Sequence, residues 1–290
     1  MIICPDCKIE LTPQSNKLKC PNCDYSAEIM EGIYFFHPNA SDFQDYRSED
    51  LHLLHEAEDK YFWFKTRNSF ISSLFEKYVA KSEKIIEVGA GTGNISGMLL
   101  RRGYDVSAGE IHKTGLLYAK SYGIREAYQF DVLKSPFIEH FDVVGMFDVL
   151  EHIADDALAL KNVHQMLKKG GKVILTVPAH EWLWSRNDRV ASHKKRYEVK
   201  SIKKLFQESG FEALCIKSFF VSILPLLYLR CLLNRDDGSP PREEEYKREY
   251  FKISPVFNFM LENILNFENM ILKHFSPGAG GSLAVVGKKH

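Results

Sequence analysis

The chain has 290 residues, of which 45% are hydrophobic and 26% are charged, so it can bury one large core and a small satellite. This composition excludes a disordered tail and a fibrous repeat. Lysine plus arginine and aspartate plus glutamate each number 38, which argues against a nucleic acid as the partner. The N-terminus has no signal-peptide pattern, and the longest apolar run, residues 219–229, is too short to cross a bilayer. We therefore expect a cytoplasmic protein without a transmembrane segment.

Four of the six cysteines lie near the N-terminus in two C-x2-C pairs. They are Cys4, Cys7, Cys20 and Cys23. Four thiolates at this spacing are typical of a tetrahedral metal site with no open position for chemistry, which predicts a structural zinc ribbon over residues 1–38. Two redox-active cysteine pairs are the alternative, although the strand and helix that usually surround such a pair are missing here.

Beyond the cysteines, the apolar pattern first indicates helices and then an alternation of strands and helices. Residues 39–80 are expected to form a helical connector that packs against the rest of the chain. Strands are predicted near residues 85–88, 104–106, 127–130, 141–147, 172–177, 211–219 and 282–286. Alternating strands and helices predict an α/β domain over residues 81–290, with a mostly parallel, seven-stranded sheet and a helical insertion at about residues 221–280.

A glycine-rich segment follows the first of these strands. Gly89, Gly91 and Gly93 alternate with small residues and precede a helical pattern from Asn94. Glycines permit a tight turn with close approach of a ligand, and the free amides at a helix start favour an anion. The dinucleotide pattern G-x-G-x-x-G is incomplete, because Asn94 or Ser96 stands where its last glycine would lie. Hydride transfer with NAD is therefore a minor alternative.

Several motifs in the same order resemble those of class I, type 11-like S-adenosylmethionine-dependent methyltransferases. They are Glu87-x-Gly89-x-Gly91-x-Gly93, Glu110 after the second strand, Asp131 after the third, the segment 148–153 after the fourth and Lys168-Lys169-Gly170-Gly171 before the fifth. The resemblance covers about residues 81–220 and implies a Rossmann-like, doubly wound fold that binds S-adenosylmethionine.

This resemblance also implies roles for individual residues. The loop from Gly89 to Gly93 would hold the methionyl part of the cofactor, Glu110 would accept from both ribose hydroxyls, and Asp131 would accept from the adenine amino group. The remaining expected cofactor-binding residues are Glu87, Ala90, Ile111, Phe130, Val132 and Phe147. Two alternatives stay open: Glu110 is a solvated strand end, or Asp131 is a helix N-cap.

Acidic residues and histidines after the fourth and fifth strands are the candidate catalytic group. Asp148, Glu151 and His152 lie at i, i+3 and i+4, so they would share one face of a helix. With His193 they could bind a divalent cation that orients an acceptor hydroxyl and lowers its pKa. The set resembles the two acids and two histidines of metal-dependent small-RNA 2′-O-methyltransferases, and the segment is similar to that of quinone-biosynthesis O-methyltransferases. The alternative is a metal-free site in which His152 acts as a base or lines the pocket.

These observations predict a methyltransferase that acts on a small molecule, at a hydroxyl group, and carries a zinc ribbon. The aromatic loop at residues 178–197 is expected to form the acceptor wall, and residues 61–67 a lid over the cofactor. The insertion would form a homodimer surface, a pocket for a hydrophobic, glycan-like or lipid-like acceptor, a membrane contact or additional core. The rival functions are a zinc-ribbon rRNA or tRNA methyltransferase and a non-enzymatic, cofactor-binding adaptor.

Overall fold

The computed structural model describes residues 1–36, 50–241, 245 and 253–290. The first part of the predicted connector and part of the insertion, residues 242–244 and 246–252, lie outside the described residues.

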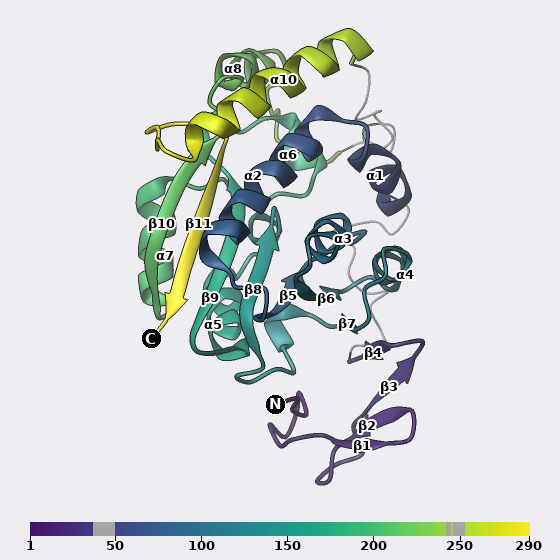
Figure 1. Ribbon diagram of the computed structural model, residues 1–290. Helices are drawn as coiled ribbons and strands as arrows, with labels where there is room; N and C mark the ends of the chain where they lie inside the picture. The colour runs from purple at the N-terminus through teal and green to yellow at the C-terminus, as the bar shows by residue number, and fades with distance from the viewer. Residues whose placement is uncertain (37–49, 242–244, 246–252) are drawn as a thin grey trace.

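The N-terminal ribbon consists of four short antiparallel strands. They are β1 (Thr12–Gln14), β2 (Lys17–Lys19), β3 (Ser26–Met30) and β4 (Ile33–Phe35). The last of them, β4, also pairs in parallel with β7 (Ala127–Gln129) of the larger domain, with Tyr34 opposite Tyr128. The ribbon is therefore not a separate satellite, because its strands continue the edge of the central sheet (Figure 1).

The larger domain contributes seven strands to this sheet, which confirms the predicted α/β, Rossmann-like class. Besides β7 they are β5 (Lys84–Val88), β6 (Asp105–Glu110), β8 (Phe141–Phe147), β9 (Leu167–Pro178), β10 (Phe211–Phe219) and β11 (Ser282–Lys289). Their order is β7-β6-β5-β8-β9-β11-β10, and β11 alone runs antiparallel to both of its neighbours. With the four ribbon strands the sheet has 11 strands, a number that differs from the expected seven because β4 pairs with β7.

Helices cover both faces of the sheet. Among the described residues, the α-helices are α1 (Asp50–Glu58), α2 (Phe62–Tyr78), α3 (Asn94–Arg101), α4 (Lys113–Ser121), α5 (Asp156–Met166), α6 (Arg186–Val190), α7 (Val199–Glu208), α8 (Leu224–Leu233) and α10 (Pro255–Leu272). Three short 3-10 helices are η2 (Val132–Lys134), η3 (Leu150–His152) and η4 (Glu181–Leu183). None of the described helices has the length and apolar character needed to span a membrane.

Successive strand residues supply two separate apolar cores. Along β11, Leu283 and Val285 join the core that contains α5 and α7, whereas Ala284 and Val286 join the core that contains α2, α3 and α10. This alternation is the period of two expected for a sheet that is buried on both faces. With both faces buried, the polar site residues gather at one edge of the sheet, at the carboxyl ends of the parallel strands.

Candidate active site

The glycine loop between β5 and α3 has the backbone conformation that the sequence predicts. Gly89 and Gly93 have φ values of +69° and +77°, which L-residues with a side chain rarely adopt. A Cβ atom on Gly89 would lie 2.6 Å from a methyl group of Val149, and one on Gly93 would lie 2.5 Å from Cβ of Ala119. Glycine is therefore required at both positions, and the backbone forms a cradle at the start of α3 that side chains would otherwise fill.

Two buried glutamates hold this loop in place. Glu87 accepts hydrogen bonds from the backbone N–H and the hydroxyl of Ser96, and its burial raises its pKa to about 8. Glu110, at the end of β6, accepts from the backbone N–H of Gly91 at 2.8 Å through Oε2. Its Oε1 accepts from two further amides, at 2.8 and 3.0 Å, in the segment that follows it, and burial raises its pKa. Three of the roughly four acceptor sites of this carboxylate are thus used by the backbone.

The other expected cofactor-binding residues divide between the site and the core. Asp131 accepts from the N–H of Leu133 at 2.8 Å through Oδ1 and caps η2, which matches the alternative considered for it. Its Oδ2 has no donor among the described residues. The Phe147 ring packs on Phe75 with centroids 6.2 Å apart, so the structure assigns Phe147 to the core. The remaining four, Ala90, Ile111, Phe130 and Val132, adjoin the loop or the ends of β6 and β7.

Helix α1, which lies within the segment 39–80 predicted as a helical connector and lid, lies over the glycine loop. Glu58, at the end of α1, is 5% exposed and accepts a hydrogen bond from the Thr92 hydroxyl. Its burial raises its pKa to about 7. The His55 ring stacks on Tyr118 of α4 with centroids 4.4 Å apart. The covering element is therefore α1, a part of the predicted connector that precedes the aromatic segment at residues 61–67.

Asp148 does not join the predicted catalytic group. Its Oδ2 accepts from Nη1 of Arg67 at 2.6 Å, and its Oδ1 accepts from the Thr176 hydroxyl at 3.0 Å. The Arg67 guanidinium also lies 4.7 Å from the centre of the Trp63 ring. A shared helix face for Asp148, Glu151 and His152 needs an α-helix from Asp148 onward, but Asp148 has a φ of +56° and η3 begins two residues later. The aspartate therefore pairs with α2.

Glu151, His152 and His193 do come together. Each offers a ligand atom, and these atoms lie within 4.8 Å of one another. Glu151 is 1% exposed, and its Oε2 has no hydrogen-bond partner among the described residues. Burial, followed by the charge of Asp148, raises the pKa of Glu151 well above its ordinary value, whereas burial lowers the pKa of His152 to about 3. The group thus combines an unsatisfied carboxyl oxygen with a neutral imidazole, which suits a cation.

Asp188 orients this group and was not identified from the sequence. Its Oδ1 lies 2.9 Å from Nδ1 of His193 and 2.8 Å from Nε of Arg196. Although burial opposes it, the hydrogen bond from His193 and the charge of Arg196 hold the pKa of Asp188 below its ordinary value. A carboxylate on one ring nitrogen fixes the tautomer and leaves the other nitrogen for a ligand or a proton.

The loop after β9 contains a second histidine–carboxylate pair that the sequence analysis missed. Nδ1 of His180 lies 3.1 Å from Oε2 of Glu198, and its buried Nε2 has no partner among the described residues. The ring stacks on Trp182 with centroids 5.1 Å apart. His180 has a φ of +62°, so the loop holds it in a backbone conformation unusual for histidine. Nothing in the local sequence pairs His180 with a glutamate 18 positions later.

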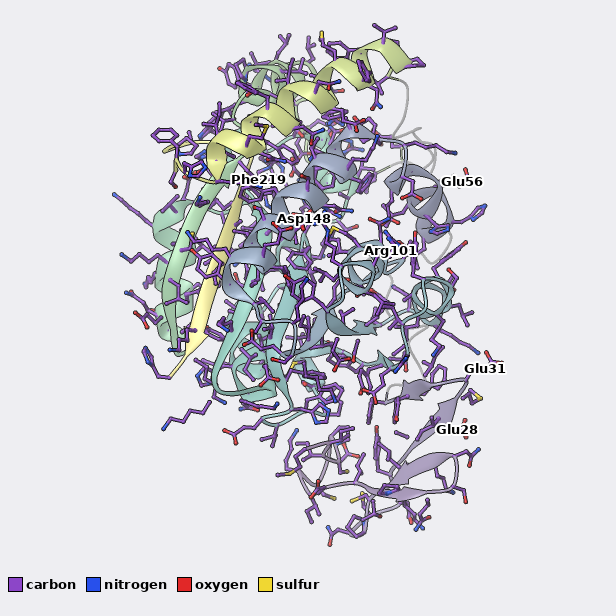
Figure 2. All side chains as sticks on the ribbon, in the orientation of Figure 1. Glu28, Glu31, Glu56, Arg101, Asp148 and Phe219 are labelled. Carbon is purple, nitrogen blue, oxygen red and sulfur yellow. The ribbon has the colours of Figure 1, made fainter. Side chains whose placement is uncertain are left out.

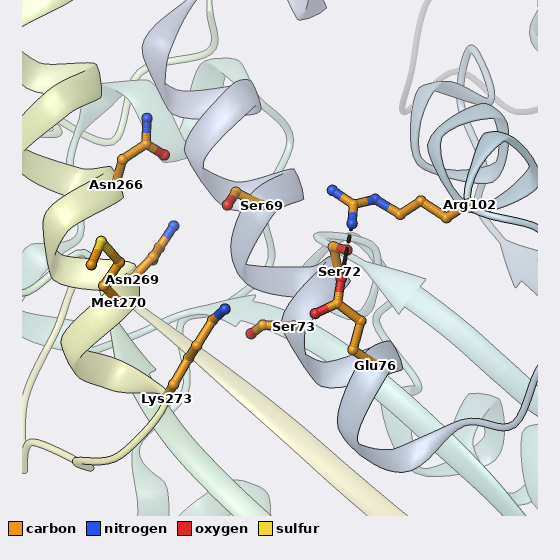
Figure 3. Close-up of a pocket in the computed structure, with 9 residues that line it drawn as sticks. All are labelled: Ser69, Ser72, Ser73, Glu76, Arg102, Asn266, Asn269, Met270 and Lys273. Atoms are coloured by element: carbon orange, nitrogen blue, oxygen red, sulfur yellow. Dashed lines mark hydrogen bonds and ion pairs between the residues drawn. The ribbon is translucent and has the colours of Figure 1, made fainter.

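A small pocket of about 330 Å³ lies between α2 and α10, apart from the glycine loop (Figure 3). Its lining residues are polar or charged except for Met270, and they include the ion pair between Arg102 and Glu76 at 2.9 Å. It contains none of the predicted site residues, so we assign it no part in the site.

The four N-terminal cysteines form a cluster whose geometry is compatible with zinc. Their sulfur atoms lie within 4.8 Å of one another. The backbone N–H of Cys7 lies 3.4 Å from Sγ of Cys4, and that of Asn22 lies 3.4 Å from Sγ of Cys20. Four converging thiols are the donor set of a structural zinc site.

Comparisons with known proteins agree with this geometry. A sequence family described as a methyltransferase domain matches residues 53–216, which is more than half of the chain. The ubiquinone biosynthesis O-methyltransferase of Pseudomonas aeruginosa (strain UCBPP-PA14) is 26% identical over 101 residues, covering 32% of this chain and 44% of that protein. The protein of the same name from Pseudomonas putida (strain F1) is 26% identical over 108 residues, covering 35% and 47%. The match thus spans less than half the length of these curated relatives.

Solved structures show the same fold at low sequence identity. Phosphoethanolamine N-methyltransferase 2 of Haemonchus contortus, determined with S-adenosyl-L-methionine, superimposes with a TM-score of 0.53 at 16% identity, covering 87% of this chain and 59% of that one. A SAM-dependent methyltransferase of Thermotoga maritima gives a TM-score of 0.51 at 18% identity, covering 83% and 100%. The fold and the glycine loop define the class of S-adenosylmethionine-dependent methyltransferases. The chain belongs to this methyltransferase-domain family.

Proposed function

We propose that this chain transfers a methyl group from S-adenosylmethionine to an oxygen atom of a small-molecule acceptor. The observation that carries the proposal is the glycine cradle at the start of α3, closed on one side by the buried Glu110 carboxylate. The name O-methyltransferase of the curated relatives supports oxygen as the acceptor atom.

The cofactor-binding residues follow from the same cradle. S-adenosylmethionine supplies a methyl group that is activated by a positively charged sulfur. The loop from Gly89 to Gly93 would bind its amino-acid tail, and Asp131 would accept from the adenine amino group through Oδ2. Glu110 would accept from the ribose, but with three backbone amides already bound it retains about one further acceptor site. Pairing with both ribose hydroxyls therefore requires it to release or share the Gly91 amide.

The acceptor would lie beside Glu151, His152 and His193. We propose that these three residues bind a divalent cation, which orients an acceptor hydroxyl and lowers its pKa. The unsatisfied Oε2 of Glu151 and the Asp188 carboxylate behind His193 support this donor set. Without a cation, the neutral His152 ring would line the acceptor pocket, because a pKa of about 3 makes it a weak base.

The cysteine cluster is proposed to bind one structural zinc ion.

The balanced charge of the chain favours a small acceptor over RNA. The cytoplasm is the proposed location, and a homodimer remains the alternative use of the insertion. A filter-binding assay with an RNA and a salt series tests the rival function of an RNA methyltransferase, because that function requires an RNA affinity that falls as salt is added.

Methyl transfer from labelled S-adenosylmethionine to a panel of hydroxylated small molecules tests the proposal. We expect transfer that a chelator abolishes and an added divalent metal restores. Glu151→Gln should reduce it strongly, whereas Glu208→Gln, at a surface position with a 61% exposed side chain, should leave it unchanged. Methyl transfer that resists a chelator would exclude the proposed cation site. Failure to bind S-adenosylhomocysteine would exclude the proposed function altogether.

A further inference from the structure

Helices α8 and α10 carry an unusually apolar outer surface. We call the exposed side chains of Leu229 and Leu233 on α8, of Phe259, Phe267 and Met270 on α10, and of Phe275 just after α10 the apolar cap. Leu233 is 75% exposed, Phe259 69% and Met270 64%. Both helices lie at the end of the molecule opposite the ribbon (Figure 1), and many side chains project outward from this end (Figure 2).

The cap is distinct from the face that α10 uses for folding. Leu261, Leu265 and Leu272 are buried in the core that contains α2. Glu268 is also buried and accepts from the N–H groups of Val221 and Ser222 at 2.9 and 2.6 Å, which ties the segment before α8 to α10. A helix at a protein surface normally places charged residues opposite its buried face. Here that opposite face carries Phe259, Phe267 and Met270, with Asn263 as a polar residue among them, and no described residue covers it.

Three exposed cations lie beside the cap, and the acids that directly follow Arg235 are paired, Asp236 with Arg189 and Asp237 with Arg186. Arg230, Arg235 and Lys273 are exposed and have no acidic partner among the described residues. The two acids of α10 are neutralised or buried, because Glu262 pairs with Lys65 at 2.6 Å and Glu268 is 6% exposed. Apolar side chains beside unpaired cations complement a surface that is apolar inside and anionic at its rim.

Two aromatic residues extend the cap toward the loop after β9. Trp182 is 50% exposed and Tyr228 is 47% exposed, and their rings meet edge to face with centroids 5.7 Å apart. Such rings, with an apolar body and a polar atom, are enriched where hydrocarbon meets headgroups. The cap is fixed to this loop, because the N–H of Arg186 donates to the carbonyl of Asn234 at 2.8 Å.

We propose that the apolar cap binds the surface of an anionic phospholipid bilayer, with α10 lying in the plane of the interface. The combination of exposed aromatic and aliphatic side chains, unpaired cations and absence of free acids on the described part of α10 supports lipid as the occupant. This proposal does not depend on the chemistry at the glycine loop.

Flotation of the whole chain with lipid vesicles tests it. Binding to phosphatidylcholine vesicles containing phosphatidylglycerol should exceed binding to pure phosphatidylcholine roughly tenfold and should weaken with salt. The double variant Phe259→Asp, Met270→Asp should lose at least about tenfold in vesicle affinity, since it removes apolar contacts and adds negative charge. Leu158→Asp, Leu214→Asp makes the same kind of change at two exposed leucines outside the cap and should bind as the unmodified chain does.

Titration with S-adenosylhomocysteine shows that each variant is folded. If the unmodified chain does not bind this ligand, circular dichroism shows instead that the variants are folded. Either of these readouts keeps failure at the vesicle separate from failure of the proposed function. Absence of the unmodified chain from the anionic vesicles would overturn the proposal, as would unchanged binding of the cap variant. A lipid-free dimer that Phe259→Asp, Met270→Asp dissociates would assign the cap to a second copy of the chain and would likewise overturn it.

Discussion

Replacing Glu110 with alanine tests the cofactor site where its geometry is most specific. In the structure this buried carboxylate accepts from the N–H groups of Gly91, Ile111 and His112 at 2.8 to 3.0 Å. The substitution leaves three amide donors without their acceptor and frees the loop at Gly91. It also removes the group that would bind the ribose.

The expected size of the effect follows from these contacts. A hydrogen bond to a charged group contributes about 1.5 to 3 kcal/mol, but the burial that raises the pKa of Glu110 opposes part of this gain. We therefore expect Glu110→Ala to weaken binding of S-adenosylhomocysteine by about 2 kcal/mol, or roughly thirtyfold in Kd. Glu110→Gln should lose most of this binding free energy too. Its side-chain NH2 group is a donor, and it would face backbone N–H groups that are also donors.

Isothermal titration calorimetry of the whole chain measures this effect. Glu208→Ala provides the control, since it removes a glutamate from the surface of α7. Thermal unfolding of each variant separates loss of binding from loss of fold. An affinity for S-adenosylhomocysteine that Glu110→Ala leaves unchanged would refute the assignment of this carboxylate to the cofactor site.

Three further predictions concern the metal, the covering helix and the buried ion pair. Elemental analysis should find about one zinc per chain and much less in Cys20→Ser, and a zinc-free purified chain would exclude the ribbon site. Burial raises the pKa of Glu58 from 4.5 to about 7, so the folded state holds its proton more tightly than the unfolded state and stability falls as pH rises from about 5 to 8. Glu58→Gln should remove that fall in stability. At pH 8 the variant should be more stable than the unmodified chain by about 2 kcal/mol, and at pH 4.5 the two should differ little. Equal urea unfolding curves at pH 8 would contradict this prediction. Arg67→Ala should lower the free energy of unfolding by about 2 kcal/mol, because the partly buried Asp148, whose side chain is 17% exposed, would lose its cation. A loss below about 1 kcal/mol in urea denaturation would show that Asp148 does not depend on this pair.

Much of the fold could be predicted because its signals are local. The strands from Lys84 to Val88 and from Phe141 to Phe147 are short apolar runs, and the glycines after Val88 require a turn that few other residues permit. The pairing of β4 with β7 could not be predicted in this way. It joins segments more than 90 residues apart, and neither strand carries a local mark of its partner.

The candidate site was predicted only in part, for a similar reason. Glu151, His152 and His193 were grouped from the sequence and do converge. Asp148 was grouped with them on the assumption of a regular helix, and its left-handed backbone turns it toward Arg67 instead. Glu58, Asp188 and the pair of His180 with Glu198 act through partners that only the tertiary structure brings near.

The structure of the chain crystallised with S-adenosylhomocysteine tests the central claim most directly. We predict the amino-acid tail in the cradle of Gly89 to Gly93, the ribose at Glu110 and the sulfur facing the side of the site that holds His152 and His193. A ligand bound elsewhere, or a cradle that stays closed at saturating ligand with the Gly91 amide still on Glu110, would contradict the account.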